Sequence, residues 1–567
     1  MDKAALTDRI RASARSFDSR AKLLRTPLTA TYHTALKPDK HPFVLALYPS
    51  VCYAFDLLEC QEEDQVRTAA DIIEAVVSCQ DQDPTRDTYG IWPYFYEEPL
   101  DRMDRPDWNM ADFHGKKLLL IVKRHAGRLP RPLVIKLKEA LYHACQAIRR
   151  RDVGSHYTNI AIMGAMVTIV GGELLEDEEL RIYGERRIQA FYAYTKEVGT
   201  FSEYNSPCYT PIAIEELRDL AELSESAVAV HTASRLLDMA WRMVARHYHP
   251  ATGAWGGPHS RTYSTLLRPN EKEFLARAMQ ADSSFLPCPR PYREWFRSSA
   301  ERYDAEPTLM EAETGYQIYA TSYQNDKLTL GSFSMGSMWN QRRNLIAYAD
   351  AGGGKTVSIR LQALMNGKDF CSAIFTGVQS RKQALFAISF ATDNGAWHQD
   401  LDMINGRFSA SDLRIRLWIG GDDVAPNIQT LQAAKRFEAQ LGERCLQMEA
   451  VLERSDYGPL SMCAERTSDG YALDYVIAAG EEREFDFHSV GQAAWLFRLS
   501  LDDALSASEV ALQSDEEWAR ASVATEDGEM AIAVLLKPQP TGHLYRSHHV
   551  QMPRVLAHKL GRNGDDL

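Results

Sequence analysis

The chain has 567 residues, of which 45% are apolar and 25% charged, the composition of an ordinary globular protein. This length exceeds what one hydrophobic core usually supports, so we expect two domains. Acidic residues outnumber basic ones by 77 to 64, which gives a formal net charge of −13. Such a surface repels nucleic acid, and the basic run Arg149–Arg151 suits a helix C-terminus instead.

The sequence shows no targeting segment and no membrane span. Charged residues such as Asp2, Lys3 and Arg9 leave no apolar stretch of secretory-signal length at the N-terminus. The longest apolar run, residues 160–170, is too short to cross a bilayer. The nine cysteines are scattered without a CxxC pair, which is typical of thiols in a reducing compartment. We expect a cytoplasmic protein without a membrane partner, unless a leader has been removed; the oligomeric state stays open.

The first half of the chain has the periodicity of helices. Apolar residues recur at three- and four-residue steps, which predicts helices over 4–24, 50–58, 66–78, 110–125, 131–149, 157–170, 177–196, 211–223 and 226–248. Some segments, such as 160–170, are apolar all round, whereas others, such as 177–196, are amphipathic. This alternation of buried and half-buried helices predicts an (α/α) toroid, an incomplete barrel of helix pairs, over residues 1–300.

The second half changes to the pattern of strands. Residues 281–310 are rich in proline and interrupt the helical pattern. Short runs rich in β-branched and aromatic residues then lie between Gly, Asn and Asp turns, at 317–323, 328–333, 357–361, 384–390, 413–418 and 531–535. Many strands without intervening helices predict an antiparallel β-sandwich over residues 301–567.

Four clusters of aromatic and hydrogen-bonding residues stand out in the helical half. They are 89–98 together with 107–114, which hold Trp92, Trp108 and Asp112; 154–159, with His156 and Asn159; 201–210, with Glu203, Tyr204, Asn205 and Tyr209; and 255–263, with His259, Arg261 and Tyr263. Flat rings beside forked polar groups suit a sugar subsite. An aromatic wedge that packs one helix pair on the next explains the first cluster equally well.

Two of these clusters lie at predicted helix starts. His156 and Asn159 are three residues apart, so we expect them to share a face at the N-terminal end of the next helix, where the dipole suits a carboxylate. A helix cap with a core histidine is the alternative. Tyr209 follows Pro207 at the start of another helix, and His259 and Arg261 are charges that could lower its pKa toward neutrality. A buried hydroxyl that tethers two loops is the alternative for Tyr209.

Several other patterns are decoys. Residues 352–356 resemble a phosphate loop, but Ala349 stands where the motif requires its first glycine. His247 and His249 lack a third metal ligand nearby, and the loop from His398 to Asp402 favours a polar turn over a cation site. We therefore predict no metal ligands at the functional site.

The helix starts at 155–159 and 200–209 resemble those of the heparinase II/III-like and alginate lyase superfamily of polysaccharide lyases. Thr200-Phe-Ser-Glu-Tyr-Asn-Ser-Pro-Cys-Tyr209 is similar to the superfamily's Glu-x-x-Ser-Pro-x-Tyr motif, and Ser155–Asn159 lies where its Asn/His neutraliser is found. The superfamily's fold is an (α/α) toroid followed by an antiparallel β-sandwich. The chain lacks the adjacent Asn-His pair of these lyases, so either His156 or Asn159 would be the neutraliser.

The resemblance implies β-elimination at a uronic acid in an acidic oligosaccharide or polysaccharide. Tyr209 would be base and acid, His156, Asn159 and Arg261 would neutralise the carboxylate, His259 would hold the tyrosine hydroxyl, and Tyr263 is a second candidate base. Trp92, Trp108, Asp112, Glu203, Tyr204 and Asn205 would bind substrate. The resemblance implies no cofactor, although it leaves room for a structural metal in the sandwich.

Two other classes of function stay open. An inverting glycoside hydrolase on the same scaffold would need two carboxyl groups, for which Asp112 and Glu203 are the natural pair. A carbohydrate-binding or assembly protein without chemistry also fits the aromatic content, but it leaves the cluster of Tyr, His and Arg unexplained.

Overall fold

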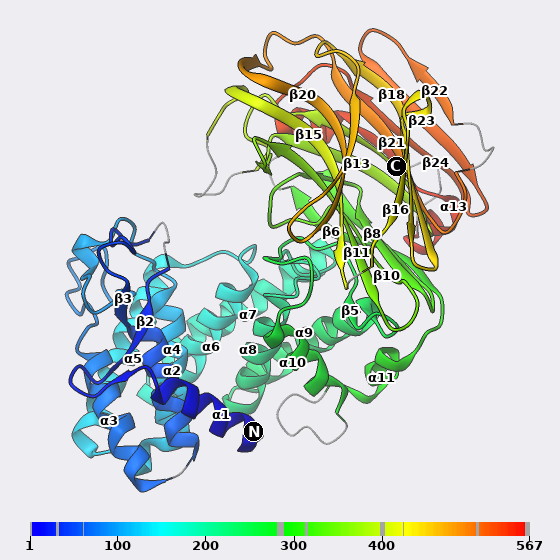
Figure 1. The fold of residues 1–567 in the computed structure, drawn as a ribbon. Helices are drawn as coiled ribbons and strands as arrows, with labels where there is room; N and C mark the ends of the chain where they lie inside the picture. Colours follow the sequence, from blue (N-terminus) through cyan, green and yellow to red (C-terminus); the bar gives the residue numbers. More distant parts are fainter. Residues whose placement is uncertain are drawn as a thin grey trace. The chain divides into compact units, whose positions relative to one another are not determined.

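The computed structural model describes residues 3–29, 33–60, 62–280, 288–311, 316–396, 403–422, 424–505 and 510–561. It divides into two compact units that are each discontinuous in sequence (Figure 1). Unit 1 comprises Met1–Glu197, Ile212–Ala240 and Gln280–Pro287, and unit 2 comprises Val198–Pro211, Trp241–Met279 and Cys288–Leu567. The loop from His398 to Asp402 and part of the proline-rich segment lie outside the described residues.

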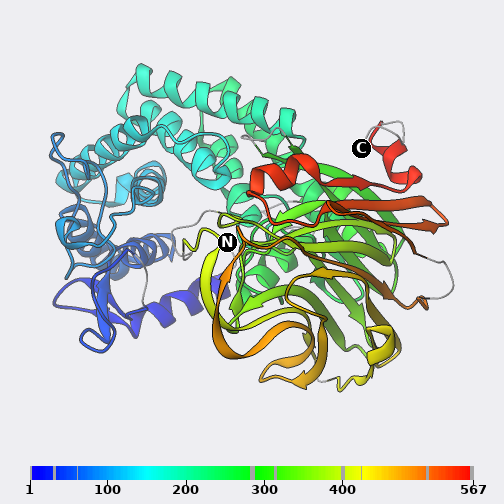
Figure 2. The same cartoon turned by 90° about the horizontal axis from the view of Figure 1, so that it is seen from above.

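The helical half contains the predicted elements. Its helices are α1 (Lys3–Ala14), α2 (Leu47–Cys60), α3 (Glu63–Val77), α4 (Met110–His125), α5 (Arg131–Arg151), α6 (Thr158–Leu175), α7 (Glu178–Val198), α8 (Thr210–Leu223) and α9 (Ala227–His247). In unit 1, α2 packs on α3 and α4, and α4 packs on α5 and α6 (Figure 2). The predictions from residue 50 to residue 248 are confirmed.

The prediction of one long helix over residues 4–24 is wrong. Helix α1 ends at Ala14, and the chain then forms a small antiparallel sheet of β1 (Phe17–Asp18), β2 (Leu23–Pro27) and β3 (Phe43–Ala46). Lys22 adopts a positive φ of 59° directly before β2, and the side chain of Asp18 accepts hydrogen bonds from the backbone of Arg20 and Ala21. This turn chemistry ends the helical periodicity.

Helix α6 is the core helix of unit 1. Its residues from Thr158 to Gly172 are all buried, as an element that is apolar all round must be. Among the described residues it is the one helix long and apolar enough to cross a membrane, but 83% of it is buried inside the protein. Burial of this extent is what the central helix of a helical domain shows.

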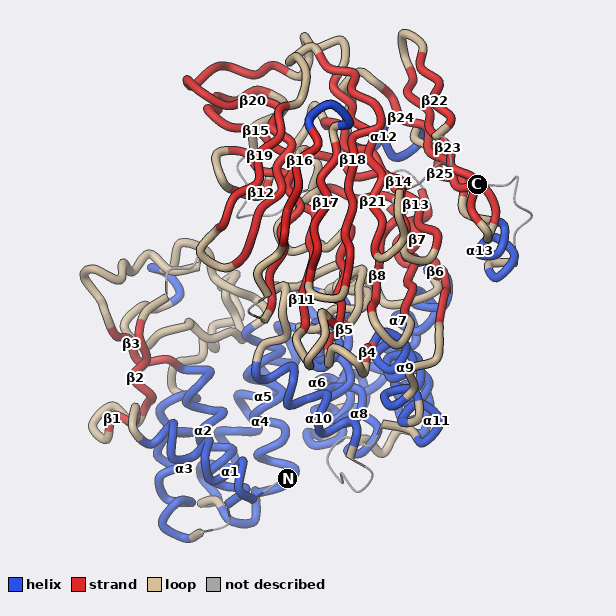
Figure 3. Tube along the Cα trace, turned by 45° about the vertical axis from the view of Figure 1, so that its right-hand side comes forward, coloured by secondary structure: helices blue, strands red, loops and turns tan. Residues whose placement is uncertain are grey.

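Unit 2 is built on two large antiparallel sheets (Figure 3). The nine-stranded sheet has the order β19-β20-β15-β11-β10-β8-β7-β6, with β12 on β11. Its strands are β6 (Arg302–Glu311), β7 (Tyr316–Gln324), β8 (Leu328–Phe333), β10 (Leu345–Asp350), β11 (Thr356–Met365), β12 (Lys368–Asp369), β15 (Arg407–Gly421), β19 (Ser461–Arg466) and β20 (Gly470–Asp486).

The seven-stranded sheet has the order β16-β17-β18-β21-β14-β13-β9. Its strands are β9 (Met335–Ser337), β13 (Ala373–Ser380), β14 (Gln383–Phe390), β16 (Asn427–Leu431), β17 (Arg436–Leu441), β18 (Arg444–Ser455) and β21 (Ala493–Leu501). One buried apolar cluster contains Ile415 and Leu417 of the larger sheet with Phe386, Trp495 and Phe497 of the smaller. Helices followed by stacked antiparallel sheets confirm the predicted fold class.

Smaller elements complete unit 2. A four-stranded antiparallel sheet consists of β22 (Ala511–Ser514), β23 (Trp518–Thr525), β24 (Gly528–Leu535) and β25 (His549–Gln551). Strands β4 (Tyr248–His249) and β5 (Ala254–Trp255) form a short hairpin, and the short helices are α10 (Pro269–Met279), α11 (Arg290–Arg293), α12 (Thr541–Ser547) and α13 (Arg554–Lys559). The hairpin leads into residues 255–263, one of the four polar clusters.

Candidate active site

The turn that carries Tyr209 is tied to residues 255–263, and both segments belong to unit 2. Asn205 makes the tie: its Nδ2 donates to the carbonyl oxygens of Gly256 at 2.8 Å and Pro258 at 2.9 Å, and its Oδ1 accepts from Nε1 of Trp255 at 2.6 Å. Asn205 has a φ of +48°, a conformation that asparagine tolerates better than most residues. Its side chain is fully buried and fully hydrogen-bonded, so the prediction that it binds substrate is wrong.

Ser206 places Tyr209 at the start of α8. Its Oγ accepts a hydrogen bond from the backbone N–H of Tyr209 at 3.1 Å, as an N-cap does, and donates to the carbonyl of Arg261 at 2.6 Å. One serine therefore fixes both the helix start and the backbone of Arg261.

The segment 255–263 also rests on the nine-stranded sheet. A Cβ at Gly331 of β8 would lie 2.0 Å from the carbonyl oxygen of Gly257, so only glycine permits this close approach. Backbone hydrogen bonds between His259 and Arg343, at 2.9 and 3.3 Å, join the segment to the loop 338–344 between β9 and β10. Positions in 255–263 are thus held from two sides.

His259 and Tyr204 support this arrangement from within the core. Nδ1 of His259 donates to the carbonyl of Asn205 at 2.6 Å, and burial lowers the pKa of His259 to about 4, so the ring is neutral. Nδ1 of His259 is used by this carbonyl, and the role of His259 in holding the tyrosine hydroxyl stays a prediction. The buried hydroxyl of Tyr204 lies 3.0 Å from Nε2 of His247 and 3.2 Å from Oε2 of Glu306, which excludes the predicted contact with substrate.

Tyr209 and Tyr263 form a pair of phenols at the open side of the site. Their hydroxyl groups are in hydrogen-bond contact, and their ring centroids are 6.0 Å apart. Tyr209 is partly buried, whereas Tyr263 is 51% exposed. A proton that leaves Tyr209 therefore has a direct route to solvent through Tyr263.

Arg261 lies over this pair. Its guanidinium carbon is 4.6 Å from the centroid of the Tyr209 ring, and its Nη2 is 3.5 Å from the hydroxyl of Tyr263. Its Nε donates to Oε1 of Gln341 at 2.8 Å, and its Nη1 lies 3.3 Å from Oε1 of Glu203. These contacts orient a cation next to a phenol, a cation–π arrangement that keeps the charge close to Tyr209.

The resting protonation state of Tyr209 differs from the prediction. Burial raises the pKa of Tyr209 well above its ordinary value, and this effect exceeds the lowering by Arg261. The neighbouring Tyr263 and Glu203 raise it further. Tyr209 is therefore a neutral phenol in the resting protein, and the prediction that nearby positive charge brings its pKa toward neutrality is wrong.

Two further residues of the site come from the sheet loop 338–344 and were missed in the sequence. Gln341 accepts from Arg261, and the Trp339 ring centroid is 5.7 Å from the Arg261 guanidinium carbon. Arg343 of the same loop is buried. Its Nη1 donates to the carbonyl of Asn340 at 2.6 Å, and burial lowers the pKa of Arg343 to about 9. The run of polar residues after Trp339, between two strongly apolar strands, was the available signal.

The remaining predicted site residues belong to unit 1. Trp92 is fully buried and stacks on His114 at 4.7 Å between centroids, so it is core packing and not a substrate wall. Trp108 is 39% exposed and donates from Nε1 to the carbonyl of Asp87 at 3.0 Å. The packing alternative is thus the correct one for Trp92, and Trp108 keeps an accessible ring.

Asp112 is 3% exposed, and burial raises its pKa to about 7 against the opposing charge of Arg187. A Cβ at Gly164 would lie 2.7 Å from both Oδ1 of Asp112 and Nη1 of Arg187, so the glycine makes room for these two groups in the helix packing. The carboxyl group of Asp112 is enclosed by α4, α6 and α7, which does not fit the predicted role in substrate binding.

His156 and Asn159 do not share a helix face. Helix α6 begins at Thr158, so His156 lies in the preceding turn, where it is exposed, whereas Asn159 is 2% exposed. Of the five residues to which the resemblance gives roles in proton transfer or in neutralising the carboxylate, and which would have to share one cleft, Tyr209, His259 and Arg261 lie in unit 2, and His156 and Asn159 lie in unit 1. Their convergence on one cleft stays a prediction.

The two histidines considered as metal ligands are structural. His247 pairs with the carbonyl of Met243 at 2.8 Å, and His249 contacts Thr252 at 2.7 Å and the carbonyl of Asn325 at 2.8 Å. Within the part of the chain that the structure describes, no group of three or more His, Cys, Asp or Glu side chains is arranged to hold a metal ion.

Comparison with known proteins gives matches at the level of the fold. A family model described as a domain of unknown function, DUF8769, matches residues 29–271. No curated protein matches the chain. Among solved structures, heparinase III has 9% identity and a TM-score of 0.41, with 86% of this chain and 82% of that chain covered.

Two other lyase structures are similarly distant. Paenibacillus xanthan lyase has 8% identity and a TM-score of 0.44, with 94% of this chain and 60% of that chain covered. Streptomyces coelicolor A3 chondroitin AC lyase, in complex with chondroitin sulphate, has 9% identity and a TM-score of 0.46, with 94% and 84% covered. The chain is thus distantly similar to polysaccharide lyases; identity this low says nothing of the roles of individual residues.

Proposed function

We propose that the protein is a lyase that cleaves a uronic-acid-containing glycan by β-elimination, with Tyr209 as base and acid. The observation that carries the proposal is the contact between the hydroxyl groups of Tyr209 and Tyr263 next to the Arg261 guanidinium. Two phenols and a cation can move one proton and stabilise one developing negative charge, which are the two requirements of this reaction.

The reaction transfers one proton and breaks one bond. The phenolate oxygen of Tyr209 takes the proton from C5 of the uronate, and the electron pair of that C–H bond forms the C4–C5 double bond. The C4–O bond breaks, and its electron pair goes to the departing oxygen. Tyr209, now a phenol, returns the proton to that oxygen, so no water is consumed.

Tyr263 would prepare Tyr209 for this role. Because burial keeps Tyr209 protonated at rest, the proton must leave before C5 is attacked. The half-exposed hydroxyl of Tyr263 accepts it and passes it to solvent. Lyase activity should therefore rise with pH through the alkaline range, as Tyr209 loses its proton.

Arg261 is the cation best placed to stabilise the charge that develops on the substrate carboxylate, because it lies in the same unit as Tyr209. Gln341 and Glu203 fix its guanidinium by contacts of 2.8 and 3.3 Å, which supplies the preorganisation that such stabilisation requires. Asn159 and His156 stay proposed neutralisers from unit 1.

The alternative, an inverting hydrolase with Asp112 and Glu203, has less support. Asp112 is 3% exposed and Glu203 is 8% exposed, and Glu203 is already paired with Arg261. Neither carboxyl group is as open to substrate as Tyr263, which is 51% exposed.

Incubation with a panel of uronic-acid glycans tests the proposal. Elimination leaves a conjugated double bond that absorbs in the ultraviolet, whereas hydrolysis leaves no chromophore. We expect ultraviolet absorbance to grow with at least one glycan and to be absent with Tyr209→Phe. Products that form without absorbance would move the assignment to the hydrolase.

A further inference from the structure

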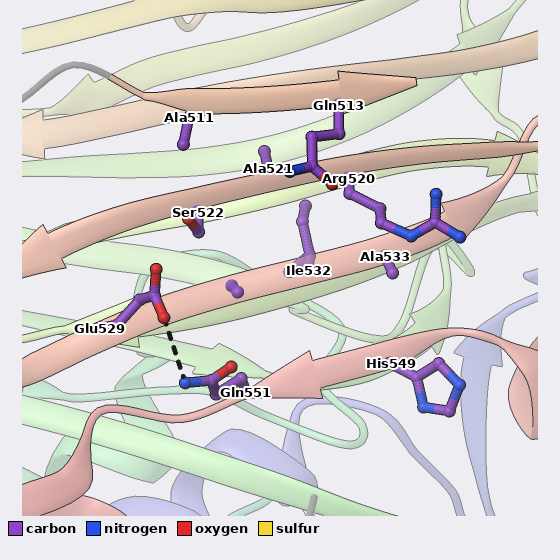
Figure 4. Close-up of a pocket in the computed structure, with 11 residues that line it drawn as sticks. Ala511, Gln513, Arg520, Ala521, Ser522, Glu529, Ile532, Ala533, His549 and Gln551 are labelled. Atoms are coloured by element: carbon purple, nitrogen blue, oxygen red, sulfur yellow. Dashed lines mark hydrogen bonds between the residues drawn. The ribbon is translucent and has the colours of Figure 1, made fainter. Parts of the chain in front are cut away.

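The outward face of the four-stranded sheet β22–β25 in unit 2 carries a hollow of about 320 Å³ (Figure 4). Side chains alternate along β23: Ala519, Ala521 and Val523 are buried, whereas Arg520 and Ser522 face outward. The volume falls within the range of about 300–1,000 Å³ that is usual for small-molecule sites.

Strand register gives the hollow a floor of small residues. One row across the sheet is Gln513, Arg520, Ala533 and His549, and the next is Ala511, Ser522, Ala531 and Gln551. Methyl groups and one hydroxyl therefore cover the centre, while long polar side chains stand around it. The floor leaves room for a flat ligand that lies along the sheet face.

The long side chains divide the rim into two chemically different ends. Arg520, His549 and Gln513 stand at one end. Glu529 and Gln551 stand at the other, joined by a hydrogen bond of 3.5 Å from Nε2 of Gln551. Glu529 pairs with Ala524 of β23, which is four residues from Arg520 on the same strand. Four residues of a strand span about 13 Å, which is the separation of the two ends along the sheet. Hydrogen-bond donors and the guanidinium of Arg520, which is paired with Asp515, lie at one end, and the carboxylate of Glu529 lies at the other.

Flat rings reinforce the basic end. The rings of Trp518 and His549 stack with centroids 6.2 Å apart and planes inclined by 23°. The guanidinium carbon of Arg520 is 5.4 Å from the centroid of Trp518, and its Nη1 lies 2.9 Å from Oδ2 of Asp515. The arginine is thus held in place by a ring and a carboxylate, and it faces the hollow in Figure 4.

We propose that this hollow is a second binding site, for an acidic oligosaccharide about two sugar units long. The carboxylate of a uronate would pair with Arg520 and His549, and hydroxyl groups further along would meet Gln551 and Glu529, whose forked ends suit neighbouring hydroxyls. Sugar rings are flat enough to lie on the alanine floor, with their C–H faces on the methyl groups.

Other occupants match the hollow less well. A peptide strand adds to a sheet edge by backbone hydrogen bonds, and the face of a sheet offers none. A nucleic acid requires several cations in a row, whereas the described rim holds the guanidinium of Arg520 and the carboxylate of Glu529. The inference rests on the hollow alone, so it does not depend on catalysis at Tyr209.

Calorimetric titration of the full chain tests the proposal with two probes, an oligogalacturonate and a cello-oligosaccharide of equal length. We expect the acidic probe to bind more tightly by at least about tenfold, because a charge-assisted contact contributes more than about 1.4 kcal/mol. Ala531→Trp fills the hollow from an outward-facing position, so it should abolish the binding that takes place in the hollow, leave any binding at the Tyr209 site, and leave circular dichroism unchanged.

Arg520→Gln should weaken the binding of the acidic probe at least tenfold. The matched control is Arg466→Gln, which changes an arginine at an exposed position of β19 and should bind the probe as the natural chain does. Turnover on a short glycan should be the same in all these variants, which separates this site from Tyr209. Equal binding by the natural chain and Ala531→Trp, or equal affinity for both probes, would overturn the proposal.

Discussion

The two polar clusters around Asp112 in unit 1 and Tyr209 in unit 2 have similar compositions but different surroundings. Asp112, His114 and Trp92 are enclosed by helices, and burial raises the pKa of the acid and lowers that of the histidine to about 3. Tyr209 sits beside a phenol that is 51% exposed and the partly buried cation of Arg261. Access to solvent, and not residue composition, separates the core polar group from the one that we propose to be reactive.

The largest expected effect follows from removal of the Tyr209 hydroxyl. Tyr209→Phe keeps the ring under Arg261 but removes the group that carries the proton, so turnover should fall by about 10²–10⁴-fold. Ultraviolet absorbance of the product measures it, and the melting temperature shows that the fold survives. Asp112→Asn is the comparison; if it abolishes turnover while Tyr209→Phe stays active, the tyrosine site is not the catalytic one.

Arg261→Ala should give a loss of about 10²–10³-fold in kcat/KM, the usual effect of one electrostatic contact to developing charge. Arg261 lowers the pKa of Tyr209, so its removal should also move the alkaline rise of activity to higher pH. The pH profile of kcat/KM measures both effects. Arg261→Lys retains the charge, so it should leave the rise nearer its original pH; an unmoved profile in Arg261→Ala would contradict the account.

Asp112 gives a prediction about stability. Its pKa is raised from 3.8 to about 7 in the folded protein, so the native state binds this proton more tightly than the unfolded chain does. The resulting stability is present at low pH and is lost as the pH rises from about 4 through 7. Asp112→Asn removes this loss, so its stability relative to the natural chain should rise by about 2–3 kcal/mol between pH 5 and pH 8.

Urea denaturation at the two pH values measures that gain. The matched control is Asp104→Asn, which changes an exposed acid of the same unit and should follow the natural chain at both pH values. A difference between Asp112→Asn and the natural chain that is the same at pH 5 and pH 8 would show that Asp112 is ionised normally.

The smallest expected effect is that of His156→Ala on stability. His156 is exposed in the turn before α6, and surface substitutions of this kind usually change the free energy of unfolding by no more than about 0.5 kcal/mol. Chemical denaturation measures the change. A loss of several kcal/mol would mean that the turn 154–157 depends on this ring, contrary to its exposure.

The fold could be predicted from the sequence where periodicity was long and unbroken. The helix over 160–170 and the strands at 328–333 and 384–390 appear as expected, because burial on every side leaves a clear pattern. The helix expected over 4–24 was wrong because the turn at Lys22 depends on local backbone chemistry that apolar spacing does not show.

The candidate site could be predicted only in part. Tyr209, Arg261 and Tyr263 come from segments already rich in hydrogen-bonding residues, and the structure brings these three together. Their partner Gln341 comes from a loop between strands, about 80 residues further along the chain, and the backbone pairing of His259 with Arg343 and of Thr262 with Gln341 brings it near. Asn205 resembles a ligand-binding residue in sequence, but its hydrogen bonds are used to join two loops.

The reaction itself can be tested most directly in water enriched in ¹⁸O. The natural chain is incubated with the glycan that gives the strongest ultraviolet signal, and the masses of the products are measured by mass spectrometry. Elimination adds no water, so the account predicts two products whose masses sum to that of the substrate, with no ¹⁸O in either. A gain of one water that carries ¹⁸O would contradict the central claim and show hydrolysis instead.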